Sequence, residues 1–286
     1  MVDFGVNMFP TDKAINPIDL AKEAEARDFE SLWFPEHSHI PTSRESPWGL
    51  NPKAPPLPEE YWRTHDQFVA LGAAAAVTSK IKLATGITLV AQRDPIWLAK
   101  EVATVDALSN GRFILGIGYG WNKEELAHHG VSFGDRRAVV RERILAMKEI
   151  WTNDEASFDG EHVSFSSSWQ WPKPTQRPHP PIVLGGAAGP KTMRDIVEYC
   201  DGFMPITGRY DIAGQVNQIK EMAEEAGRDP DSIEFGQFGT PPKEEIVESL
   251  VEAGLTRIVF GLPPAPADKV LPILDSHAEF AAKFNA

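Results

Sequence analysis

The sequence predicts an α/β protein in which all 286 residues, 1–286, form a single (β/α)8 TIM barrel with long insertions after its second and fourth strands. Short β-type runs alternate with helical patterns along the whole chain, eight of each. The strands are apolar without two-residue alternation, as strands buried on both faces are. No GxGxxG sequence opens the first helix, which disfavours the alternative of an open, doubly wound sheet.

Each expected element follows from local signals in the sequence. The strand-like runs are 3–8, 31–34, 81–85, 113–117, 182–184, 202–205, 233–238 and 257–260. The helical patterns are 18–27, 66–77, 96–108, 136–151, 192–199, 212–225, 244–253 and 269–280. Asn16 and Pro17 give the first helix an N-cap and a proline at its first position. Gly227 and Gly254 mark the ends of two later helices.

Composition excludes several classes of partner. The chain has 28 Lys and Arg against 41 Asp and Glu, a formal net charge of −13, which disfavours nucleic acids and anionic membranes. Its one cysteine, Cys200, cannot form an intrachain disulfide, which fits a reducing compartment. The start resembles no signal peptide, and no apolar run approaches the roughly 18 residues of a membrane span. We expect a cytoplasmic protein that acts on a small molecule.

Two long connections leave the carboxyl ends of strands, where the active sites of barrels lie. They are 35–63, after the second strand, and 118–135, after the fourth. The first is rich in proline and aromatic residues and is expected to wall an apolar substrate pocket through Trp48, Tyr61 and Trp62. Segment 152–181 follows a helix instead, so we expect a structural role on the opposite face.

The second strand ends in residues that can carry chemistry. Glu36 beside His37 is a candidate acid/base pair, because a carboxylate can tune an imidazole near neutral pH. Two alternatives stay open: a metal site made of Glu36, His37 and His39, and a network that only caps the loop. The neighbouring pair His128 and His129 lies in a loop and is expected to be solvated.

Glycine-rich segments follow the next three strands. The third strand ends at Thr85-Gly86-Ile87, where a glycine permits close approach of a flat ligand. The fourth continues as Gly116-Ile117-Gly118-Tyr119-Gly120, and the fifth as Gly185-Gly186-Ala187. Exposed backbone N–H groups in such loops can hold a phosphate, and Tyr119 and Trp121 offer aromatic walls. Two such loops on one barrel face suggest a phosphorylated cofactor.

These residues resemble a known family. The most specific segment is 116–125, Gly-Ile-Gly-Tyr-Gly-Trp-Asn-Lys-Glu-Glu, which is similar to the luciferase-like monooxygenase superfamily of flavin- and deazaflavin-dependent barrels. Further matching positions are Gly130, Phe133, Arg137, Glu142, Trp151, 171–174, 180–182, Gly185, Gly186, Asp201 and Gly202. The Trp121-Asn122 form resembles the branch that uses coenzyme F420.

The resemblance implies a site in the barrel mouth. It implies a non-prolyl cis peptide at Gly86–Ile87 and a catalytic role for His37, supported by Glu36. The cofactor-binding residues would be Thr85, Gly86, Ile87, Gly118, Tyr119, Gly120, Trp121, Asn122, Gly185, Gly186 and Ala187. The substrate pocket would comprise Asn7, Phe9, His39, Trp48, Tyr61 and Trp62.

The cofactor decides the chemistry that the resemblance implies. F420 would transfer a hydride to or from a small organic substrate, whereas FMN, the alternative, would support oxygenation with O2. Trp121 stands where sugar-phosphate dehydrogenases of this superfamily carry a glutamate, which argues against that substrate. Basic residues for the acidic tail of F420 would be Arg93, Arg136, Arg137, Lys191 and Arg194. Related barrels often form homodimers. A metal-dependent hydrolase or lyase and a non-catalytic cofactor-binding protein remain as further alternatives.

Overall fold

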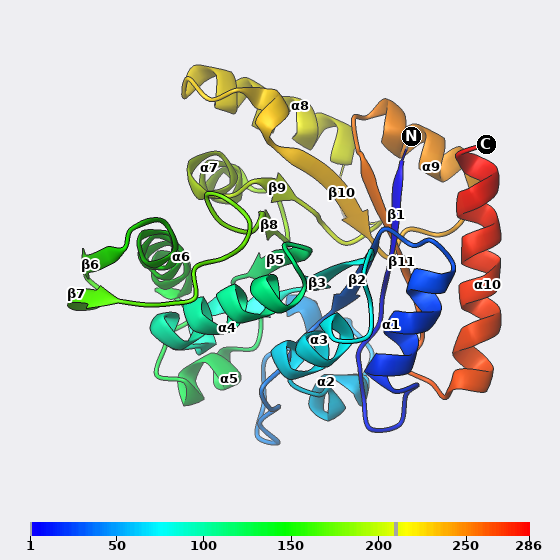
Figure 1. Cartoon of the computed structure of the whole chain (residues 1–286), viewed down its shortest axis with the longest axis horizontal. Helices are drawn as coiled ribbons and strands as arrows, with labels where there is room; N and C mark the ends of the chain where they lie inside the picture. Colours follow the sequence, from blue (N-terminus) through cyan, green and yellow to red (C-terminus); the bar gives the residue numbers. More distant parts are fainter. Residues whose placement is uncertain (1, 209–210) are drawn as a thin grey trace.

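The computed structural model describes residues 2–208 and 211–286, and its centre is a closed barrel of parallel strands (Figure 1). The barrel strands are β1 (Asp3–Asn7), β2 (Ser31–Phe34), β3 (Lys82–Thr85), β5 (Phe113–Gly118), β8 (Ile182–Leu184), β9 (Gly202–Phe203), β10 (Glu234–Phe238) and β11 (Arg257–Gly261). Pairing of β1 with β11, and of β3 with β5, closes the ring. The predicted (β/α)8 barrel is confirmed.

Helices cover the outside of the barrel (Figure 1). They are α1 (Pro17–Ala26), α3 (Gln67–Ala75), α4 (Pro95–Leu108), α6 (Arg136–Thr152), α7 (Pro190–Tyr199), α8 (Ile212–Glu225), α9 (Glu244–Glu252) and α10 (Ala267–Phe284). The predicted N-cap is confirmed, since Asn16 Oδ1 accepts a hydrogen bond from the Ile18 N–H at 2.9 Å. Asp66 and Asp94 cap α3 and α4 in the same way.

The long connections contain elements that the sequence did not predict. These are η1 (Trp48–Leu50), α2 (Glu60–Arg63), β4 (Thr88–Leu89), η2 (Val90–Gln92), α5 (Lys123–His128), β6 (Glu155–Asp159), β7 (Ser164–Trp169) and η3 (Pro230–Ser232). Strands β6 and β7 form an antiparallel hairpin beside α6. Glu142 of α6 anchors its turn by accepting the backbone N–H groups of residues 161–163. The hairpin is mostly exposed, so no buried apolar pattern marks it in the sequence.

A compact apolar cluster fills the inside of the barrel. It consists of Trp33, Ala84, Ile114, Val183, Met204, Phe238 and Val259, with Ile87 packed against it. Trp33 is fully buried, and its indole N–H donates to the Ser31 hydroxyl at 2.8 Å. A larger apolar cluster lies between the strands and the surrounding helices. The side chains inside the barrel therefore leave space only near the strand ends.

A buried charge network closes the amino-terminal end of the barrel. Arg257 is 2% exposed and donates to Glu30 at 2.9 Å, and it also pairs with Glu234. Its guanidinium lies 5.9 Å from the Trp33 ring centroid. Burial raises the pKa of Glu30, but Arg257 and then Lys82 lower it more, so the pKa lies below its ordinary value. Glu30 is therefore held as a carboxylate under the barrel core.

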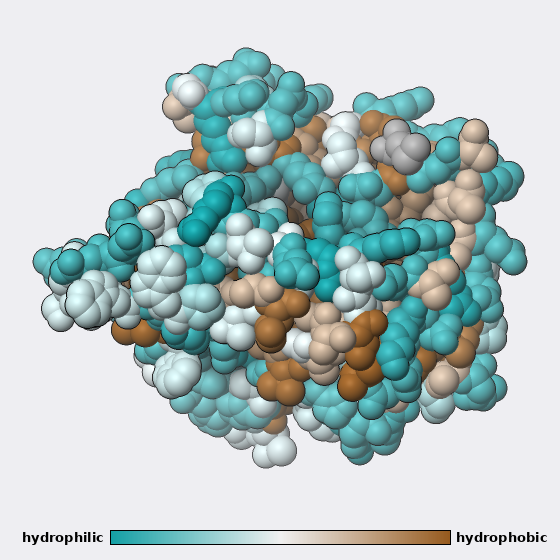
Figure 2. All heavy atoms as spheres, viewed as in Figure 1, coloured by the Kyte–Doolittle hydropathy of each residue, from teal (hydrophilic) through white to brown (hydrophobic). Residues whose placement is uncertain are grey.

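The surface is mainly polar. Figure 2 shows a largely hydrophilic face on which apolar residues gather in small groups. Within the described residues, no helix has both the length and the apolar character needed to cross a lipid bilayer.

Replacing Arg257 should destabilise the fold strongly. Arg257→Ala leaves Glu30 and Glu234 without their buried partner, so we expect the free energy of unfolding to fall by about 3–5 kcal/mol. Urea denaturation measures this change, with Arg27→Ala, which removes a partly exposed ion pair, as the control. In the wild type, the stabilisation from Glu30 is present above the ordinary glutamate pKa and is lost as pH falls through its lowered folded pKa. Equal stability of the two variants would contradict this role.

Candidate active site

A cavity of about 220 Å³ opens at the carboxyl ends of the strands, and its lining is mainly apolar. We call it the mouth cavity. Of the predicted site residues it is lined by Asn7, Phe9, Glu36, His37, Tyr61, Gly86, Ile87, Trp121, Gly185 and Gly186. Further lining residues, which the sequence did not single out, are Pro35, Leu89, Met204, Ile206 and Phe238. The cavity therefore combines residues from both halves of the chain.

The cis peptide bond expected at Gly86–Ile87 is present at the wall of this cavity. Glycines beside it allow the chain to pack closely. A Cβ atom on Gly118 would lie 1.7 Å from Ile87 Cδ1, and one on Gly185 would lie 2.9 Å from Ile87 Cγ2. A Cβ on Gly116 would lie 2.0 Å from the Thr85 carbonyl oxygen. Glycine is needed at these three positions because a side chain there would collide with Ile87 or with the Thr85 carbonyl and displace the segment that carries Ile87.

His37 lies in the cavity wall and is held by a carboxylate. Its Nδ1 lies 2.7 Å from Oε2 of Glu125, and the side chains of the two residues are 5% and 0% exposed. With Glu125 as a carboxylate and His37 as a neutral imidazole, the hydrogen lies on Nδ1 and the lone pair on Nε2. The His37 ring also contacts Tyr61 and Trp121, at centroid distances of 5.1 and 5.8 Å. This arrangement suits His37 for proton transfer at Nε2.

The segment after β5 ties two loops together through helix α5. Asn122 caps the helix, with its Oδ1 accepting from the Glu125 N–H at 3.3 Å. Glu124 accepts the backbone N–H groups of Glu45 and Ser46, both at 3.1 Å. Glu125 accepts from His37 and from the Ser38 N–H. The long loop after β2 is therefore held by Glu124 and Glu125 in the first turn of α5. Asn122, predicted to bind cofactor, is a buried cap that does not line the mouth cavity.

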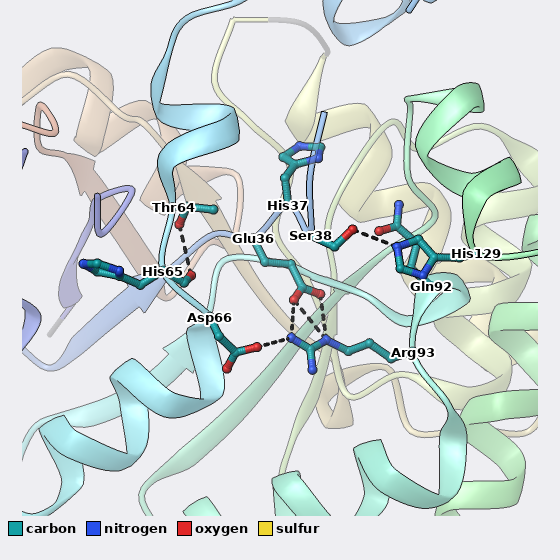
Figure 3. A pocket seen from close by; sticks show the side chains of 9 residues that line it. All are labelled: Glu36, His37, Ser38, Thr64, His65, Asp66, Gln92, Arg93 and His129. Carbon is teal, nitrogen blue, oxygen red and sulfur yellow. Dashed lines mark hydrogen bonds and ion pairs between the residues drawn. The ribbon is translucent and has the colours of Figure 1, made fainter. Parts of the chain in front are cut away.

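Glu36, expected to support His37, bonds to other groups in the structure. Glu36 accepts from the Leu89 N–H at 2.6 Å and from Arg93 Nη2 at 2.6 Å. Figure 3 shows its carboxylate directed toward Arg93, while the His37 ring points to the other side. Glu36 and His37 both line the mouth cavity, but their side chains bond to different partners. Glu125, which the sequence analysis did not select, takes the place expected for Glu36.

Arg93 is also not available for an acidic cofactor tail. It forms ion pairs with Glu36, with Asp66 at 2.9 Å and with Glu101 at 3.0 Å. Burial lowers the pKa of Arg93, but Glu36 and Asp66 raise it more, and the net shift is upward. Arg93 therefore anchors Glu36 from behind the strand end.

Tyr119 faces away from the mouth cavity. Its hydroxyl donates to Asp195, and the Arg137 guanidinium lies 3.9 Å from its ring centroid. Burial and then Asp195 raise the pKa of Tyr119, which keeps the hydroxyl protonated. Arg137 pairs with Asp195 at 3.1 Å, and Arg136 stacks on Phe133. The expectation of Tyr119 as a cofactor wall is therefore corrected.

Four further cofactor residues were expected beside the cavity and do not line it. Thr85 is fully buried and donates its hydroxyl to the Gly116 carbonyl at 2.8 Å. Gly118 lies beneath Ile87, and Gly120, at φ +80°, forms the turn before α5. Ala187 is exposed on the loop before α7.

Three predicted substrate residues lie outside the mouth cavity. Trp48 packs against the outer side of Tyr61, at a centroid distance of 5.7 Å. Trp62 is half exposed in a separate groove with Leu57. His39 is bonded to His128, Nε2 to Nδ1, at 2.8 Å. Among the described residues, no three His, Cys, Asp or Glu side chains are arranged to hold a metal ion, and Glu36, His37 and His39 have the separate partners given above.

Comparison with known proteins finds one matching family and several relatives. A sequence model of the luciferase-like monooxygenase family matches residues 10–246. An uncharacterised protein of Mycobacterium tuberculosis is 40% identical over 267 residues, which are 93% of each chain. The F420-dependent glucose-6-phosphate dehydrogenase of Amycolatopsis mediterranei is 29% identical over 67% of this chain and 53% of its own. The FMNH2-dependent dimethylsulfone monooxygenase of Pseudomonas putida is 30% identical over 60% of this chain and 47% of its own.

Solved structures share the fold over the whole chain. The monooxygenase RslO1 from Streptomyces bottropensis superposes with a TM-score of 0.79 at 19% identity, over 99% of this chain and 100% of its own. An F420-dependent secondary alcohol dehydrogenase superposes with a TM-score of 0.78 at 18% identity, over 99% of each chain.

A substitution at Gly116 tests the close packing of the strand ends beneath the mouth cavity. Gly116→Ala should lower the free energy of unfolding by about 3 kcal/mol, because the new Cβ meets the backbone oxygen of Thr85 at 2.0 Å. Gly72→Ala is the matched control, since a Cβ there meets nothing within 4 Å and α3 favours alanine. Urea denaturation compares the two. Equal stability of the two variants would contradict the close contact between Gly116 and the Thr85 carbonyl.

Proposed function

The chain belongs to the luciferase-like monooxygenase family, and on this premise we propose that it is an F420-dependent oxidoreductase. The reaction would transfer a hydride between the deazaflavin and a small, largely apolar organic substrate. The observation that carries this proposal is the His37–Glu125 pair at the wall of an apolar cavity, beside the Gly86–Ile87 cis peptide.

His37 supplies the proton step that such a reaction needs. When F420 is bound, it accepts or donates a hydride on its ring. Oxidation of an alcohol then leaves one proton on the substrate oxygen, and Nε2 of His37 is placed to take it. Among the described residues Nε2 has no hydrogen-bond partner, while Nδ1 is held by Glu125. In the reverse direction, the same nitrogen gives a proton to the oxygen of a carbonyl.

The mouth cavity fits a flat ring cofactor. Gly86, Gly185 and Gly186 bring backbone to its surface, and a Cβ on Gly186 would meet no atom within 4 Å. Ile87 and Met204 add apolar wall. A planar ring can therefore lie against backbone and side-chain carbon without displacing a side chain.

The start of α7 suits the charged part of F420. Lys191 and Arg194 are exposed near its first turn, which begins four residues after Gly186. Neither forms an ion pair with another described residue. A helix N-terminus with two free cations favours a phosphate and an acidic tail.

The lining also indicates the kind of substrate. Among the described residues that line the mouth cavity there is no lysine or arginine, and Tyr61, Trp121 and Phe238 present aromatic carbon. A sugar phosphate would need a cation there. A small apolar alcohol or carbonyl compound fits better.

An FMN-dependent monooxygenase is the second candidate. It is favoured by the 30% identity to an FMNH2-dependent monooxygenase, and an apolar cavity serves oxygenation as well. The F420-dependent dehydrogenase relative supports the first candidate, and it matches over more of the chain. The cofactor preference separates the two.

Parallel titrations test this preference. Trp121 lines the cavity and Trp33 lies beneath it, so ring binding should quench the tryptophan fluorescence. We expect F420 to bind with a Kd of about micromolar and FMN at least about tenfold more weakly. Tighter binding of FMN, together with oxygen uptake by the reduced complex, would support the second candidate instead.

Removing the imidazole tests the proton step. In His37→Ala, turnover of F420 with a panel of short-chain alcohols should fall by about 10²–10⁴-fold, because the imidazole Nε2 that takes the substrate proton is removed. F420 affinity, measured by fluorescence, should stay within about twofold, since a proton-transfer residue adds little to ground-state binding. His162→Ala, in the β6–β7 turn, is the matched control. Full turnover in His37→Ala would remove the role assigned to this residue.

A further inference from the structure

A second cavity, of about 350 Å³, lies on the other side of His37 and is polar. We call it the back cavity. Ser38, Asp66, Arg93 and His129 contribute to its wall, as Figure 3 shows. His37 borders both cavities. Together with Glu36, it lies between the apolar mouth cavity and a cavity lined by polar side chains.

A continuous chain of hydrogen bonds starts at the partner of His37. Ser38 Oγ lies 3.4 Å from Oε1 of Glu125, and it lies 2.7 Å from His129 Nε2. Ser38 Oγ also lies 2.9 Å from His39 Nδ1, and His39 Nε2 lies 2.8 Å from His128 Nδ1. The three histidines are all exposed or nearly so. This series of hydrogen bonds thus runs from the fully buried Glu125 carboxylate to the surface.

The donors and acceptors along this series of hydrogen bonds can be assigned consistently. Glu125 can only accept, so the Ser38 hydroxyl donates to it. The Ser38 oxygen can then accept from both His129 Nε2 and His39 Nδ1. His39 Nε2 is left as an acceptor for His128 Nδ1. One assignment of hydrogens satisfies every link.

We propose that Ser38 and the histidines His39, His128 and His129 form a proton-transfer route that connects the His37–Glu125 pair to solvent. The proposal rests on the proposed function, because hydride transfer is what leaves a proton on His37. A separate route is needed since cofactor and substrate would cover the Nε2 side of a ring that is only 5% exposed.

Each proton step is balanced along the route. A proton leaves the substrate oxygen and binds His37 Nε2, and the proton on Nδ1 passes to Glu125. The Glu125 carboxyl turns this proton to the Ser38 side and gives it to the hydroxyl, which gives its own proton to Nε2 of His129 after that imidazole has moved its hydrogen to Nδ1. The histidine releases a proton to water, and the reverse sequence supplies one.

The charge environment prepares His129 to accept a proton. Burial and the neighbouring His39 lower the pKa of His129, against the opposing charges of Glu125 and Glu36. His128 lowers the pKa further, and Arg93 lines the same back cavity. The neutral form of His129 is therefore favoured, and its Nε2 accepts from the Ser38 hydroxyl in the tautomer that carries the hydrogen on Nδ1.

Proton exchange at His37 tests the route without requiring turnover. In the full chain labelled with ¹⁵N-histidine, NMR saturation transfer measures the exchange of the His37 Nδ1–H with water, with and without F420. Ser38→Ala, which cuts both branches, and the double variant His39→Gln/His129→Gln should each slow this exchange at least about tenfold. Ser38→Thr, which keeps the hydroxyl, should retain it, and His162→Gln is the control outside the cluster.

The outcomes separate the route from the proposed function. Exchange within about twofold of wild type in both Ser38→Ala and the double variant would overturn the route, even if F420 binds and turns over. If F420 does not bind, the proposed function fails, while slowed exchange in these variants would still support the hydrogen-bond route. An unchanged ¹⁵N shift of His37 in the double variant shows that the pair with Glu125 is intact and that the slowed exchange is not a folding defect.

Discussion

The hydrogen bond between His37 and Glu125 is the interaction on which the mouth of the barrel depends. It joins the end of β2 to helix α5, which lies 88 residues later in the chain. It sets the hydrogen on Nδ1 and leaves Nε2 for chemistry. Because Glu124 and Glu125 also hold the backbone of residues 38, 45 and 46, the same helix shapes the loop that carries Tyr61. Without this bond, the His37 side chain would not be held in the wall between the mouth cavity and the back cavity.

Close packing of the barrel strands forms the wall of the mouth cavity that lies opposite His37. Gly116, Gly118 and Gly185 let the Gly86–Ile87 segment sit against two neighbouring strands. Trp33 and its apolar neighbours fill the barrel below, and Arg257 closes its amino-terminal end. The mouth cavity borders this segment at the strand ends, between the backbone of Gly86 and Gly185 and the His37 imidazole. In the proposed reaction, the apolar cavity beside His37 would hold the reacting groups, and the cavity lined by polar side chains would serve proton exchange.

Much of the fold follows from the sequence because barrel strands and helices have strong local signals. The strand 182–184 and the helix 212–225 were predicted to the residue, while the exposed, serine-rich hairpin β6–β7 lacks an apolar pattern. The cis bond at Gly86–Ile87 came from a family resemblance, not from spacing. Glu125 was missed because Asn122 with Glu125 three residues later is typical of a helix cap, and its distant partner is set only by the closed barrel. Glu36 was expected to hold His37 because the two are neighbours in sequence, whereas the folded chain pairs Glu36 with Arg93.

The central claim is that this mouth cavity holds a deazaflavin ring beside His37. A crystal structure of the protein with bound F420 tests it most directly. We expect the ring to lie against Gly86–Ile87, with His37 Nδ1 still bonded to Glu125 and Nε2 facing the space next to the ring. A ring bound elsewhere, or a His37 side chain turned away from Glu125 in the complex, would contradict it.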